Sequence, residues 1–244
     1  MSQWRIGDVT VTKIVEQEVN GGNRSLLPKA TPEWLRPYLI GDVACLRLSI
    51  HSFVVDTPSK RIVVDTCLGN DKRKRAVDYW NDRQGPFLDD RAAAGFAADT
   101  IDAVVNTHLH IDHVGWNTML RGDKWVPTFP NARYLMSGVE FEYWRDHATR
   151  DDTRQMLADS ITPVIDAGLA DLVETDHRIC DEVTLIPTIG HTSGHVSVRI
   201  ESCGEQAVIT GDFMHHPCQI AHPDWDLTSD SDPAQGIRTR WEMF

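Results

Sequence analysis

The sequence lacks the features that mark nucleic-acid-binding and membrane-spanning proteins. Its 24 Lys and Arg residues are outnumbered by 36 Asp and Glu residues, which gives a formal net charge of −12. Binding through phosphate groups needs clustered positive charge. Crossing a bilayer needs a run of roughly 18 apolar residues, and no stretch of the sequence approaches that. We therefore expect neither a nucleic-acid partner nor a membrane partner.

The sequence also has little that would indicate secretion or a disulfide framework. Its five cysteines are scattered and odd in number, and no two are spaced as Cys-x-x-Cys. Such usage predicts neither paired disulfides nor a thiolate zinc site. The first residues alternate like a strand and lack the basic and apolar regions of a signal peptide. We expect a reducing, cytoplasmic location.

What the sequence does contain is enough apolar material for one large domain over residues 1–244, with 41% hydrophobic residues. Short apolar or alternating runs predict strands, and amphipathic spacing predicts helices. The expected strands are 9–15, 46–55, 61–65, 101–105, 133–135, 172–173, 183–187, 196–200 and 207–210. The expected helices are 88–96, 138–144 and 233–244. Residues 71–90 are polar, and we interpret them as a long exposed excursion. This mixture suits an α/β sandwich of two mixed sheets flanked by helices.

The densest cluster of potential metal ligands is His-Leu-His-Ile-Asp-His, from His108 to His113, directly after the predicted strand 101–105. Residues i and i+2 on an extended backbone point the same way, so His108 and His110 can reach one ion. Asp112 and His113 follow in a segment that could begin a helix, and they would be aimed a few ångströms away. The spacing indicates a second metal position there.

Two later segments extend this cluster. A glycine-punctuated loop, Gly-His-Thr-Ser-Gly-His, places His191 and His195 between two predicted strands. His191 would complete a three-histidine site with an open position for water, as catalytic zinc requires. Asp212 follows another predicted strand, and its two carboxylate oxygens make it the candidate to bridge two cations.

Together these segments resemble the metallo-β-lactamase superfamily, and within it the branch of lactonases and organophosphate hydrolases such as methyl parathion hydrolase. The resemblance implies an αβ/βα four-layer sandwich with a dinuclear site at the edge of its sheets. By this resemblance, His108, His110 and His191 would bind one metal, Asp112 and His113 the other, and Asp212 both. Asp65 and His195 match positions that support the ligands from behind. Zinc is the expected metal, with iron or manganese as alternatives.

The pattern departs from the family near the C-terminus. The family takes one further His from a late strand, well beyond the bridging Asp, and no such strand follows Asp212 here. We expect a C-terminal truncation that removes the last strand and helix and weakens the second metal site. His216 is the local substitute to test first. An unpaired sheet edge would also favour a homodimer.

The resemblance implies a hydrolase in which metal-held hydroxide attacks an electrophilic carbonyl, opening a lactone or cleaving an ester. Asp112 would be the catalytic residue that orients the water or passes its proton to the leaving group. Alternatives are a phosphotriester or β-lactam hydrolase, an iron-dependent redox enzyme, and a weakly active or inactive metal-binding remnant. The acidic chain argues against a nuclease of the same superfamily.

A small-molecule substrate would need a pocket over the metals. The apolar, turn-rich segment 25–39, which includes Trp34, could form a hydrophobic wall there. Trp116, Met214 and His216 lie near ligands in the sequence and complete the candidate pocket. Core packing is the competing interpretation for Trp34 and Trp116.

Overall fold

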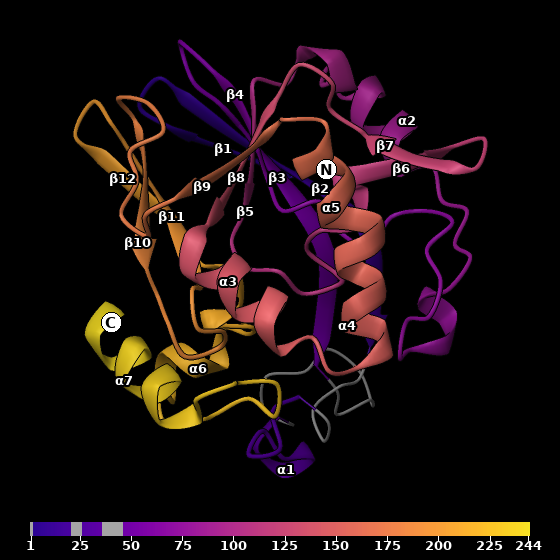
Figure 1. Ribbon diagram of the computed structural model, residues 1–244. Helices are drawn as coiled ribbons and strands as arrows, with labels where there is room; N and C mark the ends of the chain where they lie inside the picture. Colours follow the sequence, from indigo (N-terminus) through magenta and orange to yellow (C-terminus); the bar gives the residue numbers. More distant parts are fainter. Residues whose placement is uncertain (1, 21–25, 36–45) are drawn as a thin grey trace.

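The fold is taken from a computed structural model, which describes residues 2–20, 26–35 and 46–244 (Figure 1). Its strands are β1 (Ser2–Ile6), β2 (Val9–Asn20), β3 (Arg47–Asp56), β4 (Arg61–Val64), β5 (Ala103–Asn106), β6 (Thr118–Arg121), β7 (Lys124–Pro127), β8 (Arg133–Ser137), β9 (Ala170–Val173), β10 (Val183–Pro187), β11 (Val196–Ser202) and β12 (Glu205–Ile209). Its helices are α1 (Pro32–Leu35), α2 (Phe87–Ala93), α3 (Gly138–His147), α4 (Asp151–Met156), α5 (Thr162–Asp166), α6 (Cys218–Ala221) and α7 (Pro233–Met243). A π-helical turn, Leu157–Ile161, joins α4 to α5.

Two sheets carry the fold. The larger has the order β1-β2-β3-β4-β5-β8-β9, and the smaller has the order β10-β11-β12. Pairing in the large sheet is antiparallel from β1 to β4 and parallel from β4 to β9. The central strands are apolar on both faces, as parallel strands covered on both sides must be. Ile62 and Val64 of β4 face one core cluster, and Val63 between them faces the other.

The two faces of the large sheet are covered differently. On one face, residues of β2 to β5 pack against apolar residues of β10, β11 and β12, so the first core cluster fills the space between the two sheets. On the other face, the second cluster includes Phe87 of α2 and Val164 of α5. Figure 1 shows the small sheet on one side of the large one and the helices α3 to α5 on another. This layering is the sandwich predicted from the sequence.

The loops with potential metal ligands meet at one edge of the two sheets. Asp65 follows β4 and His108 follows the neighbouring parallel strand β5, so both come from the same end of the large sheet. His191 lies in the loop between β10 and β11, and Asp212 follows β12. The backbone N–H of Val196 donates to the carbonyl of Thr107 (2.9 Å) and ties the two sheets together at this edge.

The segment after β12 returns to the same edge. Helix α7, yellow in Figure 1, packs so closely that a Cβ on Gly190 would lie 2.3 Å from the backbone nitrogen of Gly236. Gly190 also has φ +130°, a conformation that strongly favours glycine. The buried guanidinium of Arg240 donates to the carbonyls of Pro223 (2.9 Å) and Phe213 (3.1 Å). The helix expected over 233–244 therefore holds the loop that contains His191.

Several expectations need correction. Residues 71–90 are not a wholly exposed excursion, since Lys72 is 0% exposed and Arg75 only 4%. Residues 111–113 form a turn rather than the start of a helix. The sequence analysis did not predict the β6–β7 hairpin or the helices between Asp151 and Asp166, whereas the alternation of the first residues agrees with strand β1. No helix within the described ranges is long and apolar enough to span a membrane.

Candidate metal centre

Three histidines converge on one point at the shared sheet edge; His108 and His191 are buried, and His110 is partly exposed. His108 Nε2 lies 3.0 Å from His110 Nδ1, which in turn lies 3.0 Å from His191 Nε2. His108 is 0% exposed and His191 only 1%. Hydrogen bonding among the three nitrogens cannot satisfy them all, because a proton on His110 Nδ1 can serve only one neighbour at full strength. Such a convergence of buried acceptors fits a cation.

Acceptors behind the rings fix which nitrogens face this point. Thr107 Oγ1 donates to Asp65 Oδ2 (2.8 Å), so it accepts the proton of His108 Nδ1 (3.0 Å). His191 Nδ1 donates to Asp230 Oδ1 (3.0 Å). In both rings the protonated nitrogen points outward, and the lone pair of Nε2 points into the cluster. This is how metal-binding histidines are usually oriented.

Burial keeps this histidine set neutral. It lowers the pKa of His108 well below its usual value, and the neighbouring histidines act in the same direction. Burial likewise lowers the pKa of His110 and of His191 to about 3. At neutral pH these imidazoles carry no charge, so their lone pairs are available to a metal without loss of a proton.

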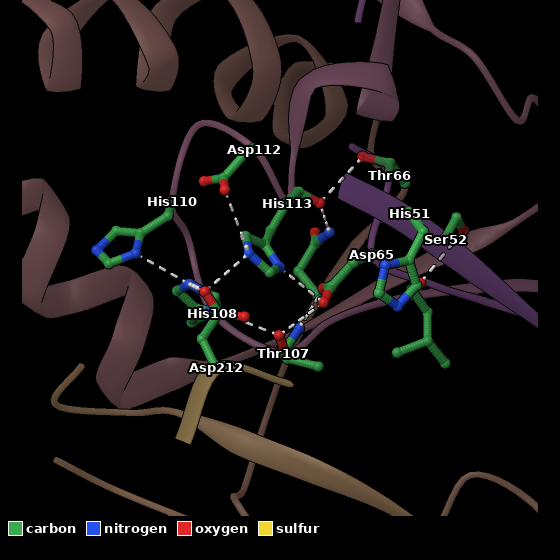
Figure 2. Close-up of polar contacts among 12 residues, drawn as sticks. His51, Ser52, Asp65, Thr66, Thr107, His108, His110, Asp112, His113 and Asp212 are labelled. Carbon is green, nitrogen blue, oxygen red and sulfur yellow. Dashed lines mark hydrogen bonds and ion pairs between the residues drawn. The ribbon is translucent and has the colours of Figure 1, made fainter. Parts of the chain in front are cut away.

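A second group forms around His113 (Figure 2). Its Nδ1 donates to Asp65 Oδ2 (2.8 Å), and its Nε2 lies 3.2 Å from Asp212 Oδ2 and 3.8 Å from Asp112 Oδ2. Burial lowers the pKa of His113, but the charges of Asp212, Asp65 and Asp112 outweigh it and raise the pKa well above its usual value. Three carboxylates around one imidazole make a strongly negative pocket that favours positive charge.

One carboxylate oxygen stands between the two groups. Asp212 Oδ2 lies 4.0 Å from His108 Nε2 and 3.7 Å from His191 Nε2 on one side, and 3.2 Å from His113 Nε2 on the other. It also lies 2.8 Å from His215 Nε2. Burial raises the pKa of Asp212, but His113 and His215 outweigh it and hold this pKa well below its usual value.

His195 holds the backbone of Asp212 in place. The Asp212 N–H donates to His195 Nε2 (2.9 Å), which must therefore be unprotonated, so Nδ1–H donates to Thr188 Oγ1 (2.9 Å). Thr188 is linked onward to Ser197 Oγ (2.9 Å). Burial lowers the pKa of His195 well below its usual value, consistent with this neutral form.

The donor set suits a divalent transition metal. Potential ligand atoms within 4.8 Å of one another come in three overlapping groups: His108, His110 and His191; His108, His113 and Asp212; and His191, Asp212 and His215. Imidazole nitrogens with carboxylate oxygens are typical zinc ligands, and a carboxylate shared between two groups suits two neighbouring cations. Asp112 is a quarter exposed and stands at the solvent side of the second group.

The residues proposed for a substrate pocket do not all reach the site. Trp116 is buried in the core, where its ring stacks on Phe87 and its Nε1 donates to Glu16 Oε1 (2.7 Å). It is therefore not a pocket wall. His216 Nδ1 accepts from the backbone of Cys218 (3.2 Å), and it belongs to none of the three ligand groups.

A role of Trp34 and Met214 in lining a substrate pocket stays a prediction. Trp34 packs edge-on against Trp225, with ring centroids 4.7 Å apart, beside His222. Met214 is half-buried, and its neighbours in the sequence are the core residue Phe213 and His215. Residues 25 and 36–39 of the predicted apolar wall lie outside the described residues.

Sequence reasoning missed two residues that the structure brings to the site. His215, not His216, faces Asp212, and its position three residues after Asp212 was the available signal. Asp230 is buried behind His191 and also lies 3.6 Å from Arg240. Nothing near Asp230 in the sequence marks it as a partner of a histidine 39 residues earlier.

Comparison with known proteins agrees with this fold and cluster. Two packed sheets with a His and Asp cluster at their common edge define a class of metal-binding α/β proteins. The protein-family model described as "Metallo-beta-lactamase superfamily" matches residues 46–239 of the sequence. The chain belongs to this superfamily, as the sequence motifs predicted.

Other known proteins resemble the chain in sequence or in fold. An N-acyl homoserine lactonase of Bacillus cereus is 24% identical over 172 residues, which cover 64% of this chain and 60% of the lactonase. A second lactonase, from a Bacillus species, is matched over 36% of its length, so the chain spans less than two thirds of the length of either relative. A probable metal-dependent hydrolase from Staphylococcus aureus superimposes with TM-score 0.82 at 21% identity, over 99% of this chain and 86% of that one. The dizinc quorum-quenching lactonase AidC gives TM-score 0.79 at 21% identity, over 99% and 84%.

Proposed function

We propose that the chain is a zinc-dependent hydrolase that opens a lactone or cleaves a related ester. The observation that supports this most strongly is the convergence of ring nitrogens from His108, His110 and His191 beside the carboxylate of Asp212. The lactonases among its relatives favour a lactone as the substrate class.

The proposed division of ligands follows the two sides of Asp212. His108, His110 and His191 would hold one cation, and Asp112 and His113 the other, with Asp212 touching both. His215 is a further donor on the side of His191, because its Nε2 lies 2.8 Å from Asp212 Oδ2. Its Nδ1 is buried without a hydrogen-bond partner among the described residues.

When bound, a divalent cation lowers the pKa of a coordinated water to about 7 and polarises the substrate carbonyl. The chain's own contribution is to direct the proton. Asp112, the most exposed carboxylate of the cluster, would accept the proton of the attacking water and deliver it to the leaving oxygen. Asp65 would keep His113 in the tautomer that presents Nε2 to the centre.

The test compares two histidine variants of the zinc-loaded chain on a panel of N-acyl homoserine lactones, esters, a phosphotriester and a β-lactam. His110→Gln removes a ligand and should lower lactone turnover by about a thousandfold, since a lost cation forfeits several kcal/mol of transition-state stabilisation. His147→Gln is the control: His147 is exposed on α3 and bonds only to its own helix, at Tyr143.

Zinc content is measured in parallel by mass spectrometry. Hydrolysis of the phosphotriester or the β-lactam alone would overturn the proposed substrate class. Wild-type protein that retains no zinc would overturn the proposed function as a whole.

A further inference from the structure

Glu140 is a buried carboxylate that joins the two loops of the histidine set. It lies in the first turn of α3 and is 1% exposed. Its Oε1 accepts from the backbone of Leu109 (3.0 Å) and from Trp144 Nε1 (2.7 Å), and its Oε2 accepts from the backbone of Gly194 (2.8 Å). Each oxygen therefore holds a different loop.

The two backbone donors lie close to proposed ligands in the chain. Leu109 separates His108 from His110, and Gly194 lies between His191 and His195. A single side chain thus links the β5 loop to the β10–β11 loop, directly behind the point where the histidines converge.

Close packing at Gly194 makes this link rigid. A Cβ at Gly194 would lie 2.3 Å from the backbone nitrogen of Glu140 and 2.7 Å from its Cα, so the loop passes directly against the start of α3. On the other side, the Trp144 ring that donates to Glu140 lies edge-on to His110, with centroids 5.5 Å apart. Glu140 therefore touches both loops directly and reaches His110 through Trp144.

Glu140 is not needed as a cap for its own helix. Ser137 is the N-cap of α3 and Glu140 stands three residues later, a spacing at which a Glu usually turns back to the N-cap N–H. Here the carboxylate bonds to Leu109, Trp144 and Gly194 instead. Burial raises the pKa of Glu140, while the N–H donors of these neighbours lower it. Burying a carboxylate costs solvation free energy unless hydrogen bonds compensate for it. For Glu140, two of the compensating donors come from the two loops that it joins.

We propose that Glu140 is a positioning residue that sets the distance between the His108–His110 pair and His191, and so determines the affinity of the first cation position. This inference rests on the proposed metal-dependent function. It concerns the geometry of the ligands and assigns Glu140 no contact with the cation or the substrate.

The chain offers a matched control in Glu16. This carboxylate is also largely buried, and it accepts from the backbones of Leu68 (2.7 Å) and Gly69 (3.3 Å) and from Trp116 Nε1 (2.7 Å). Two backbone N–H groups and one indole N–H thus bind each glutamate. The donors of Glu16, however, lie on the side of His113 and Asp65: Trp116 follows His113 by three residues and Leu68 follows Asp65 by three, and none stands next to His108, His110 or His191.

The experiment compares Glu140→Gln with Glu16→Gln by chelator competition for zinc and by the visible absorption of the cobalt-loaded chain, with unfolding in urea as the measure of stability. Both variants should lose similar stability without metal. Only Glu140→Gln should bind the tighter zinc ion 10- to 100-fold more weakly, the usual effect of losing a group behind a ligand, and shift the cobalt absorption.

Equal zinc affinity and an unchanged cobalt spectrum in Glu140→Gln would overturn the proposal. Should that variant not fold, Trp144→Phe decides, because it removes one donor and keeps the ring: a spectrum identical to that of the wild type would contradict the positioning role. Zinc binding by the wild type separates the two hypotheses, since its absence would refute the proposed function itself.

Discussion

Two buried polar clusters among the described residues balance the negative charge of their carboxylates in different ways. At the metal centre, carboxylates surround histidines whose lone pairs converge. In the second cluster, Arg75 donates to both oxygens of Asp159 (2.9 and 3.0 Å), and the ammonium of Lys72 lies 3.6 Å from Asp159 Oδ1. Lys72 also donates to Thr118 Oγ1 (2.7 Å).

The difference shows how a metal site can be distinguished from a structural ion pair. Side-chain cations already balance Asp159, so the Lys72–Arg75–Asp159 cluster needs no external ion. Around Asp212 the neighbouring His108, His110 and His191 are held neutral by burial. These three histidines therefore supply no positive charge to Asp212, whereas Arg75 supplies it to Asp159.

Breaking the second cluster should give the largest loss of stability. Arg75→Met leaves the buried charge of Asp159 with Lys72 alone, and removing one partner of a buried ion pair typically costs about 3–5 kcal/mol. Urea unfolding of the metal-free protein measures this loss. Zinc affinity should remain that of the wild type.

Arg73→Met is the matched control, since Arg73 forms an exposed pair with Asp82 and such pairs contribute about 0–1 kcal/mol. Equal losses in the two variants would show that burial does not distinguish the two ion pairs.

Breaking the support of one metal ligand should affect the other cluster. Asp230→Asn weakens the acceptor for His191 Nδ1–H, and we expect zinc affinity to fall about 10- to 100-fold. Chelator competition measures the change. Asp226→Asn controls for charge, because Asp226 pairs with the half-exposed Lys29 (2.8 Å) and belongs to none of the three ligand groups. Unaltered zinc affinity in Asp230→Asn would show that Asp230 does not support His191 as a ligand.

The convergence of histidines and Asp212 was largely predictable from the sequence, and the ion-pair cluster was not. The histidines of one short motif are adjacent in the chain, and their spacing and the alternating apolar strands determine where they lie. Lys72 meets the carbonyl of Asp159 from 87 residues away, and Trp116 meets Glu16 from 100 residues away. Contacts of that range depend on packing that no local pattern shows.

The sequence also could not show which of the adjacent residues His215 and His216 contacts Asp212. Both follow Asp212 closely, and composition does not separate them. The short 3-10 turn over Gly211–Phe213 decides which ring faces the carboxylate. The sequence analysis named His216, whereas the structure places the adjacent His215 against Asp212.

The smallest expected effect concerns the pH dependence of the second cluster. Burial lowers the pKa of Lys72 from 10.5 to about 7, against the opposing charge of Asp159. Between these pH values the unfolded chain holds a proton that the folded chain has released, so this group makes stability rise with pH.

Lys72→Met should remove that contribution, which amounts to at most about 1.4 kcal/mol per pH unit. Urea unfolding at several pH values between 7.5 and 9.5 measures the slope. Lys74→Met is the exposed control on the same loop. Parallel stability curves for Lys72→Met and the wild type would contradict a depressed pKa at Lys72.

The central claim is that the converging histidines hold a cation and the Lys72–Arg75–Asp159 cluster does not. Anomalous diffraction at the zinc absorption edge, from crystals grown with zinc, tests it most directly. We predict a peak among His108 Nε2, His110 Nδ1 and His191 Nε2, and none beside Asp159. Absence of a peak at the three histidines, in crystals whose zinc is bound elsewhere on the chain, would contradict the account.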